Sequence, residues 1–263
     1  NRHVGGVLHI APKSSKSIAE FASAALGGAA MTTKLTVLAT GGTIAGIAGS
    51  AIAHDYRAGE IGIEDYLERV GGLGLEAELS GTQIANIDSA DIGPDAWHSL
   101  HIAALAALAD GDCQGIIVTH GTDTLEETAF LLDLTLPATK PVVVVGAMRP
   151  ADAVGYDGLR NFANAVRVAS DAQASGRGVL VVMGDRVFAA RDVRKVRTRG
   201  TEAFRGFPRE SVGLVTPASL EWFGAPWRSE TQTAFAWPET LPEVIVVFAY
   251  AGLDGAAVRR QIG

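Results

Sequence analysis

The segment Gly115–Glu127, GIIVTHGTDTLEE, carries the signals that decide the fold. It begins with a short apolar run rich in β-branched residues, which is typical of a strand buried on both faces. A glycine then breaks the run, and Thr124 followed by Glu127 predicts a capping box at the start of a helix. This order places Thr122 and Asp123 at the carboxyl end of a parallel strand, where open α/β sheets hold their ligands.

The same alternation of strands and helices continues along the chain. The pattern predicts strands and helices over these residues: strands 35–39, 82–87, 141–145 and 178–183, and helices 63–70, 94–109, 125–134 and 159–170. Strands that alternate with helices about every 30 residues are typical of βαβ units. We therefore predict an α/β fold whose N-terminal domain is a three-layer, mainly parallel sheet with helices on both faces.

The chain also divides into segments of different composition. We expect a leader or disordered extension, an N-terminal domain, a proline-rich connector and the start of a smaller α/β C-terminal domain that is truncated: residues 1–30, 31–209, 210–242 and 243–263. In the last segment, 243–250 is predicted to be a buried strand and 255–262 to begin a helix. A strand and a partial helix cannot form a core alone.

Composition narrows the class of protein. The 263 residues carry a net charge of −7, which argues against nucleic-acid and anionic-membrane partners because both need a positive surface. The apolar content is ordinary for a soluble globular protein. Glu20 interrupts the apolar part of residues 1–30, so we expect a cytoplasmic protein. A periplasmic location is the alternative if those residues contain an export signal.

A second glycine turn follows the first predicted strand. Its glycines, at 41, 42 and 46, lack the spacing of a dinucleotide fingerprint and the lysine of a phosphate-binding loop. A tight βα turn would explain them by itself. However, Thr43 places a hydroxyl at the carboxyl end of this strand, as Thr122 does at the end of the strand that begins at Gly115. The two threonines could face a common crevice.

A threonine hydroxyl is a poor nucleophile unless another group takes its proton. The chain has no Gly-x-Ser-x-Gly elbow, no His-Glu-x-x-His and no metal-spaced cysteines. Tyr56, in the loop after Thr43, could act as a general base or proton relay. Lys195 could serve Thr122 if it is buried, although a solvated cation in a basic run is the simpler interpretation.

Other conspicuous residues have plainer interpretations. His120 leads into a glycine turn, which favours a packed, hydrogen-bonded histidine over a catalytic one. The basic stretch 186–205 would suit phosphate or nucleic acid, but the net charge opposes this. Three tryptophans are predicted to cover exposed apolar surface: Trp222, Trp227 and Trp237.

Two motifs in the right order resemble the bacterial-type L-asparaginases and the related glutaminase-asparaginases. They are LATGGTIAG at 38–46 and VTHGTDT at 118–124, and 141–150, 178–183 and 191–195 fit as well. The likeness runs from about residue 34 to the end, and the long loop to Tyr56 is more similar to the type II branch. It implies hydrolysis of L-asparagine to L-aspartate and ammonia, with a side activity on L-glutamine. The alternatives are a glutaminase-asparaginase, another small-amide amidase, or a catalytically dead amino-acid-binding paralogue.

The resemblance also implies catalytic roles for four residues. Thr43 matches the primary nucleophile, which forms an acyl-enzyme, and Tyr56 matches its partner in the loop. Thr122 matches the second threonine, and Lys195 matches the lysine beside it. This reverses the simpler interpretation of Lys195.

Substrate-binding roles are implied in the same way. Ser89 matches a residue that binds the substrate α-carboxylate, and Asp123 matches the acid that binds the amino group. The backbone at Gly42 and Gly121 is expected to contact substrate beside the two threonines. Ala90 departs from the family, whose members usually carry a polar contact there. The resemblance implies no metal, no cofactor and a homotetramer built from dimers at full length.

Overall fold

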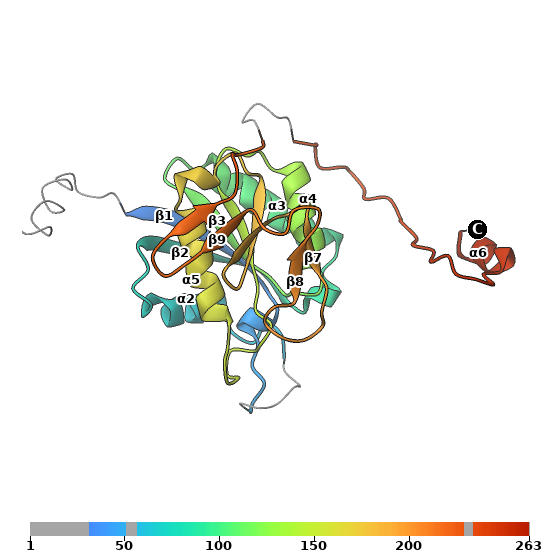
Figure 1. Cartoon of the computed structure of the whole chain (residues 1–263), viewed down its shortest axis with the longest axis horizontal. Coiled ribbons are helices and arrows are strands. Elements are labelled where there is room, and N and C mark those ends of the chain that lie inside the picture. Colours follow the sequence, from blue (N-terminus) through green and yellow to red (C-terminus); the bar gives the residue numbers. More distant parts are fainter. Residues whose placement is uncertain (1–31, 51–56, 229–233, 263) are drawn as a thin grey trace, which may run out of the picture. The chain divides into compact units, whose positions relative to one another are not determined.

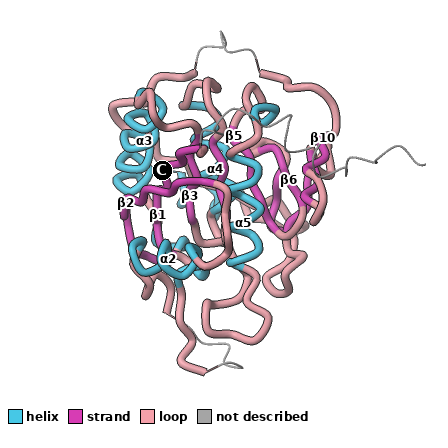
Figure 2. Tube along the Cα trace, turned by 90° about the vertical axis from the view of Figure 1, so that its left-hand side faces the viewer, coloured by secondary structure: helices cyan, strands magenta, loops and turns pink. Residues whose placement is uncertain are grey.

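The main body is organised around one eight-stranded sheet in the order β10-β9-β6-β5-β4-β3-β1-β2. The computed structural model describes residues 32–50, 57–228 and 234–262. Adjacent strands from β2 to β5 run parallel, and the pairs β5–β6, β6–β9 and β9–β10 run antiparallel. Figure 2 shows this order across the sheet, from β2 and β1 to β10.

The strands are β1 (Thr33–Gly41), β2 (Ala77–Ile87), β3 (Gly115–Thr119), β4 (Val142–Val145), β5 (Val179–Met183), β6 (Arg186–Ala189), β7 (Val193–Lys195), β8 (Phe204–Gly206), β9 (Gly213–Val215) and β10 (Leu220–Trp222). The helices are α2 (Ile63–Gly71), α3 (Pro94–Ala109), α4 (Leu125–Thr135), α5 (Gly158–Ala169) and α6 (Gly255–Ile262). Short 3-10 turns are η1 (Thr43–Ala45), η2 (Ser89–Asp91) and η3 (Ala172–Ala174). The predicted strands and helices of the N-terminal domain are thus present; β2 begins at Ala77 rather than at residue 82, and the other ends shift by a few residues.

Alternation along the strands divides the core into two halves. On β4, Val143 and Val145 pack in one cluster with Phe162 of α5, while Val142 and Val144 pack in the other, with residues of α3 and α4. Residues of α2 belong to the first cluster. Two helices therefore cover each face of the sheet, α2 and α5 on one side and α3 and α4 on the other (Figure 1). The predicted three-layer α/β architecture is confirmed.

The connector expected from residue 210 is wrong in its first part. Residues 213–215 and 220–222 form β9 and β10, which extend the sheet beyond β6. The N–H and C=O groups on the edge of β6 are satisfied by β9, so tertiary pairing overrides the weak strand signal of these short segments.

The buried strand expected at 243–250 is also wrong. These residues form no strand, and Val244 and Phe248 are 77% and 80% exposed. Within the described residues no neighbouring strand is available to take their backbone hydrogen bonds, and an isolated strand is not stable in water. The helix expected at the end of the chain is present as α6.

Two further points concern membranes and the N-terminus. In the described part of the chain, no helix is both long and apolar enough to cross a bilayer. The leader expected at 1–30 lies outside the described residues.

Candidate active site

The predicted site residues of the two glycine turns, together with Ser89, lie at the carboxyl ends of three neighbouring strands. β1 has β2 on one side and β3 on the other, so the chain changes direction across the sheet at β1. Open α/β sheets bind ligands in the crevice at such a switch point. Thr43 follows β1, Ser89 follows β2 and Thr122 follows β3.

A backbone contact brings the two threonines to one place. Gly42 has φ 81° and ψ −174°, a conformation that is essentially restricted to glycine. A Cβ atom at Gly42 would lie 2.2 Å from the Cα of Gly121, so the two glycine turns touch main chain to main chain. Thr43 and Thr122, the next residue of each turn, are both buried. Tyr56, the expected partner of Thr43, lies outside the described residues.

Ser89 joins the β2 end to the turn after β3. Its Oγ accepts a hydrogen bond from the amide of Asp123 (3.1 Å), and its carbonyl accepts one from the Oγ1 of Thr124 (2.7 Å). The capping box predicted at Thr124 is therefore wrong, since no side-chain bond caps α4. The Thr124 hydroxyl, which the local pattern predicts to cap the helix, instead donates to the carbonyl of Ser89, 35 residues earlier in the sequence.

The structure places Lys195, from strand β7, against Thr122 and Asp123. Its Nζ lies 2.9 Å from the Oγ1 of Thr122 and 2.5 Å from the Oδ1 of Asp123. The lysine side chain is only 14% exposed, whereas the aspartate is 57% exposed. A charged lysine has only donors, so it can polarise the threonine oxygen while the carboxylate balances its charge.

Sequence reasoning missed Glu126, which holds Lys195 in place. Its Oε2 accepts the backbone N–H of Lys195 at 2.5 Å, and its other oxygen lies 3.9 Å from Arg194. Glu126 is in the first turn of α4, where an acidic residue is favourable next to the helix dipole. The helix start by itself explains an acidic residue at this position, so the sequence gives no sign of the contact with Lys195, which is 69 residues away.

His120 is packed and hydrogen-bonded, as predicted. It is fully buried between the strand end and α4, and its Nδ1 lies 2.6 Å from the carbonyl oxygen of Gly121. Burial lowers the pKa of His120 to about 4. The ring is therefore neutral at physiological pH.

Carboxylates surround much of the basic stretch. Several of its cations pair with acidic residues: Arg186 with Glu210, Arg191 with Asp133, Arg194 with Glu126 and Arg205 with Glu202 and Glu210. In the described part of the chain, no cluster of three or more histidine, cysteine or acidic side chains has an arrangement that could hold a metal ion.

Trp222 and Trp227 pack against the first core cluster, as expected for residues that cover apolar surface, and the tryptophans also make specific ring contacts. The guanidinium of Arg177 lies 4.3 Å from the ring centre of Trp222 and 5.7 Å from that of Trp227. Trp237 stacks on His98 with the ring centres 5.3 Å apart.

Known proteins share this fold and resemble this sequence. Residues 34–228 match the family model described as "Asparaginase, N-terminal". A probable periplasmic L-asparaginase of Haemophilus influenzae is 41% identical over 220 residues, which are 82% of this chain and 62% of that protein. L-asparaginase 2 of Escherichia coli is 39% identical over 231 residues, which are 86% of this chain and 65% of that protein.

Two further relatives widen the comparison. A glutaminase-asparaginase of Pseudomonas fluorescens is 40% identical over 230 residues, covering 86% of this chain and 63% of that protein. The solved structure of a probable cytoplasmic L-asparaginase from Campylobacter jejuni superposes with a TM-score of 0.77 at 35% identity, covering 88% of this chain and 71% of that one. The chain spans less than two thirds of the length of these three curated relatives. With two glycine–threonine turns meeting at the switch point of an α/β sheet, and with these matches, the chain belongs to the asparaginase family.

Proposed function

We propose that the protein hydrolyses L-asparagine to L-aspartate and ammonia through a threonine nucleophile and an acyl-enzyme. One observation supports the proposal: the contact between Gly42 and Gly121 joins two glycine turns that are each followed by a buried threonine, and Lys195 lies 2.9 Å from Thr122. Binding of an amino acid alone does not need a lysine beside a buried hydroxyl, which is why we favour an enzyme over a catalytically dead paralogue.

In the first step, the Oγ1 of Thr43 attacks the side-chain amide carbonyl of the substrate. The threonine proton passes to Tyr56, and ammonia leaves with a proton as the C–N bond breaks. The product of this step is an aspartyl ester on Thr43. Backbone N–H groups at the two turns stabilise the oxyanion of the tetrahedral intermediate, a contribution of about 3 kcal/mol per donor.

In the second step, water adds to the ester carbonyl beside Thr122 and Lys195. One proton of the water reaches the departing oxygen of Thr43 through the Thr122–Lys195 pair, and L-aspartate is released. The hydrogen bond from Lys195 to Thr122 supports this assignment. The charge of Lys195 is balanced by Asp123 in the ion pair at 2.5 Å.

The amino-acid end of the substrate is held by the turn after β3. We assign the substrate amino group to Asp123, of which one oxygen contacts Lys195 while the side chain remains 57% exposed. We assign the α-carboxylate to Ser89, whose Oγ accepts from the Asp123 amide and keeps its own proton for the substrate. The backbone of Gly42 and Gly121 lines the site between the threonines. Such contacts convert binding into orientation.

Ammonia release from L-asparagine tests the function. Thr43→Ala and Thr122→Ala are each expected to lower kcat on the order of 10³-fold, since either change removes a group from a two-step reaction. Thr135→Ala is the matched control, because Thr135 is also buried but, among the described residues, its hydroxyl bonds only to the Leu131 carbonyl in α4. Full activity in both site variants would overturn the assignment.

Acid quenching gives a second test that needs no steady turnover. Protein mixed with L-asparagine and quenched is expected to gain the mass of one aspartyl group, located on the peptide that contains Thr43. Lys195→Met is expected to increase the amount of this ester, because it slows the second step. An ester found on Thr122 instead would exchange the two roles.

A glutaminase-asparaginase is the second candidate, because one relative at 40% identity carries that name. The rates with L-asparagine and L-glutamine separate the two candidates. A kcat/KM for glutamine that equals or exceeds the value for asparagine would favour the second.

We further propose a homotetramer built from dimers and a cytoplasmic location. The resemblance of both motifs to the asparaginases supports the assembly, and light scattering tests it. The relatives include a probable cytoplasmic and a probable periplasmic protein, so the compartment requires cell fractionation. Recovery in the periplasmic fraction would replace the cytoplasmic assignment.

A further inference from the structure

A chain of hydrogen bonds runs from α3 through α4 into the turn that carries Thr122. The indole Nε1 of Trp97 donates to the Oγ1 of Thr128 at 2.8 Å. The same hydroxyl lies 2.9 Å from the Nε2 of His120, and the Nδ1 of His120 lies 2.6 Å from the carbonyl oxygen of Gly121. Thr128 and His120 are both fully buried, so water does not compete for these groups.

The two ends of this chain determine the direction of every bond in it. A carbonyl oxygen can only accept, so the Nδ1 of His120 must carry a proton. In the neutral ring Nε2 is then an acceptor, and it must receive the proton of the Thr128 hydroxyl. An indole N–H can only donate, so the hydroxyl oxygen accepts from Trp97. Each donor thus meets one acceptor.

The opposite tautomer does not fit the contact with Gly121. A proton on Nε2 would leave the bare Nδ1 of His120 facing the carbonyl oxygen of Gly121 at 2.6 Å, lone pair against lone pair. In a doubly protonated ring, Nε2 would donate to the Thr128 oxygen, and the Thr128 hydroxyl proton would lose its acceptor. This ring would also place a charge in a fully buried position, which is unfavourable.

The carbonyl that His120 holds belongs to the peptide group of Thr122. A trans peptide is planar, so its C=O and N–H point in opposite directions. Fixing the Gly121 oxygen on His120 therefore aims the Thr122 amide away from the ring. No acceptor for this amide is found among the residues that the structure describes.

We propose that Trp97 and Thr128 are positioning residues: through the Nδ1–H tautomer of His120 they set the direction of the Thr122 amide as an oxyanion donor. The inference rests on the proposed function, in which amides at the two turns stabilise the tetrahedral intermediate. A preorganised donor acts on the transition state, so its misalignment lowers kcat and leaves KM nearly unchanged.

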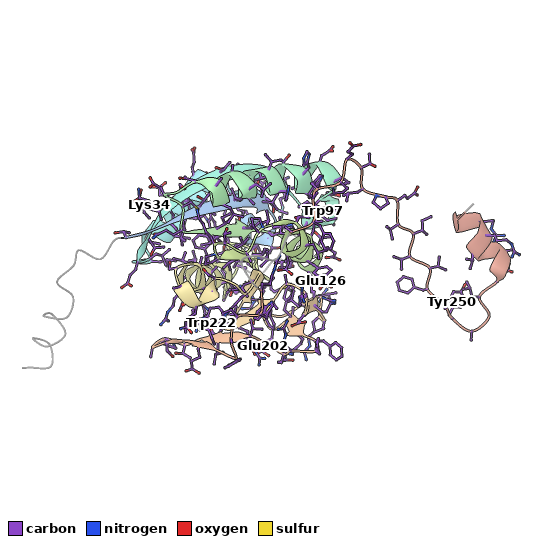
Figure 3. All side chains as sticks on the ribbon, turned by 90° about the horizontal axis from the view of Figure 1, so that it is seen from above. Lys34, Trp97, Glu126, Glu202, Trp222 and Tyr250 are labelled. Atoms are coloured by element: carbon purple, nitrogen blue, oxygen red, sulfur yellow. The ribbon has the colours of Figure 1, made fainter. Side chains whose placement is uncertain are left out.

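Figure 3 shows Trp97 on α3 near Glu126 on α4, and Trp222 well apart from both. Trp222 supplies a matched control, since its buried indole N–H has no hydrogen-bond partner in the described part of the protein. Trp97→Phe removes a donated bond, whereas Trp222→Phe makes the same chemical change without removing one.

Nitrogen-15 NMR of histidine-labelled protein at pH 7 tests the bond directions without any need for activity. His120, assigned from the spectrum of His120→Gln, is expected to show a protonated Nδ1 and a bare, hydrogen-bonded Nε2. Thr128→Val is expected to move the Nε2 resonance to the value of an unbonded nitrogen, and Thr128→Ser to restore it. A proton on Nε2 would overturn the proposal whatever the kinetics.

Kinetics with L-asparagine then test the positioning role. Thr128→Val is expected to lower kcat ~10-fold with KM unchanged, because it leaves a buried acceptor unsatisfied. Thr128→Ser should lie within ~2-fold of the unaltered protein, Trp97→Phe should lose ~3-fold, and Trp222→Phe should lose nothing. Unchanged kcat in Thr128→Val would overturn the role. If the unaltered protein released no ammonia, the proposed function and the role of the amide would both fall, while the NMR result would still decide the bond directions.

Discussion

The turn after β1 and the turn after β3 lie side by side in the site but are held by different means. The β1 turn, residues 42–46, is held by main chain: Gly42 donates to the Ile87 carbonyl at 3.0 Å and accepts from the Gly59 amide at 3.2 Å. The β3 turn, residues 120–124, is held by side chains of His120, Ser89 and Lys195. Substitutions that add atoms should therefore destabilise the protein most at the β1 turn. At the β3 turn, the loss of a side-chain interaction should matter more.

Gly42→Ala should break the β1 turn and give the largest effect. Alanine would meet the main chain of Gly121 at 2.2 Å in a conformation reserved for glycine, so we expect a loss of about 4 kcal/mol in the free energy of unfolding. Urea unfolding measures it. Gly74→Ala is the control, because Gly74 also has positive φ but nothing lies within 4 Å of an added Cβ atom, and about 1 kcal/mol is expected. Equal losses at the two positions would contradict the importance of the contact.

Acid should weaken the β3 turn, since the β1 turn contains no titratable side chain. The pKa of His120 is lowered by burial to about 4, below about 6.5 in the unfolded chain. The folded protein therefore binds fewer protons, and this stability is complete above about pH 6.5 and lost as the pH falls through about 4. The full loss is about 3 kcal/mol.

Urea unfolding at pH 7 and pH 4.5 measures this contribution. Carboxylates also titrate in this range, so the comparison is with His120→Gln, in which stability should fall less on acidification. An NMR titration of His120 provides an independent check. A midpoint near 6.5 in the folded protein would contradict the prediction.

Gly121→Ala refines the comparison of the two turns, because it adds a Cβ atom to the β3 turn, which is held by side chains. The new Cβ would lie 2.6 Å from the Oγ of Ser89, a side-chain atom, and 3.1 Å from the Cα of Gly42. Part of this strain can relax by movement of Ser89, so we expect a loss of about 2 kcal/mol. The same urea series measures it. A loss as large as that of Gly42→Ala would show that both turns depend equally on close backbone contact.

Glu126→Ala should have the smallest effect on stability. It removes the acceptor of the Lys195 amide, and because the carboxylate is 23% exposed, we expect a loss of about 1 kcal/mol. It should also lower kcat roughly tenfold by displacing Lys195 from Thr122. Glu126→Gln keeps an acceptor oxygen and should recover most of the activity.

The control for this prediction is Glu127→Ala, which changes the exposed neighbour in the same turn of α4. It should leave both stability and kcat unchanged. A matching loss in Glu127→Ala would mean that the charge of the helix start matters, rather than the bond to Lys195.

The sequence predicts well those structural features that depend only on neighbouring residues. The apolar runs that form β1, β3 and β4 and the glycines at 42 and 121 identified the strand ends, because buried parallel strands and tight turns restrict residue type locally. The packed state of His120 followed from the same turn. Assignment of Lys195 needed the family resemblance, since 73 residues separate it from Thr122.

Errors arose where a distant partner competed with a local preference. Thr124 has the spacing of a helix cap, yet its hydroxyl bonds the Ser89 carbonyl. The proline-rich composition predicts a connector that includes residues 213–222, yet these residues form strands that extend the sheet beyond the edge of β6. Residues 243–250 have the apolar composition of a strand, but they lack a partner among the described residues.

The sequence by itself determined the α/β fold and the two threonine-bearing turns, because strand burial, turn glycines and helix starts are encoded within a few residues. Only the tertiary structure decided that Gly42 touches Gly121, that Glu126 holds Lys195, and that Trp97 and Thr128 direct the ring of His120. Most of these contacts join positions that are far apart in the chain. Their energy appears only when the sheet has closed around them and water no longer competes for each hydrogen bond.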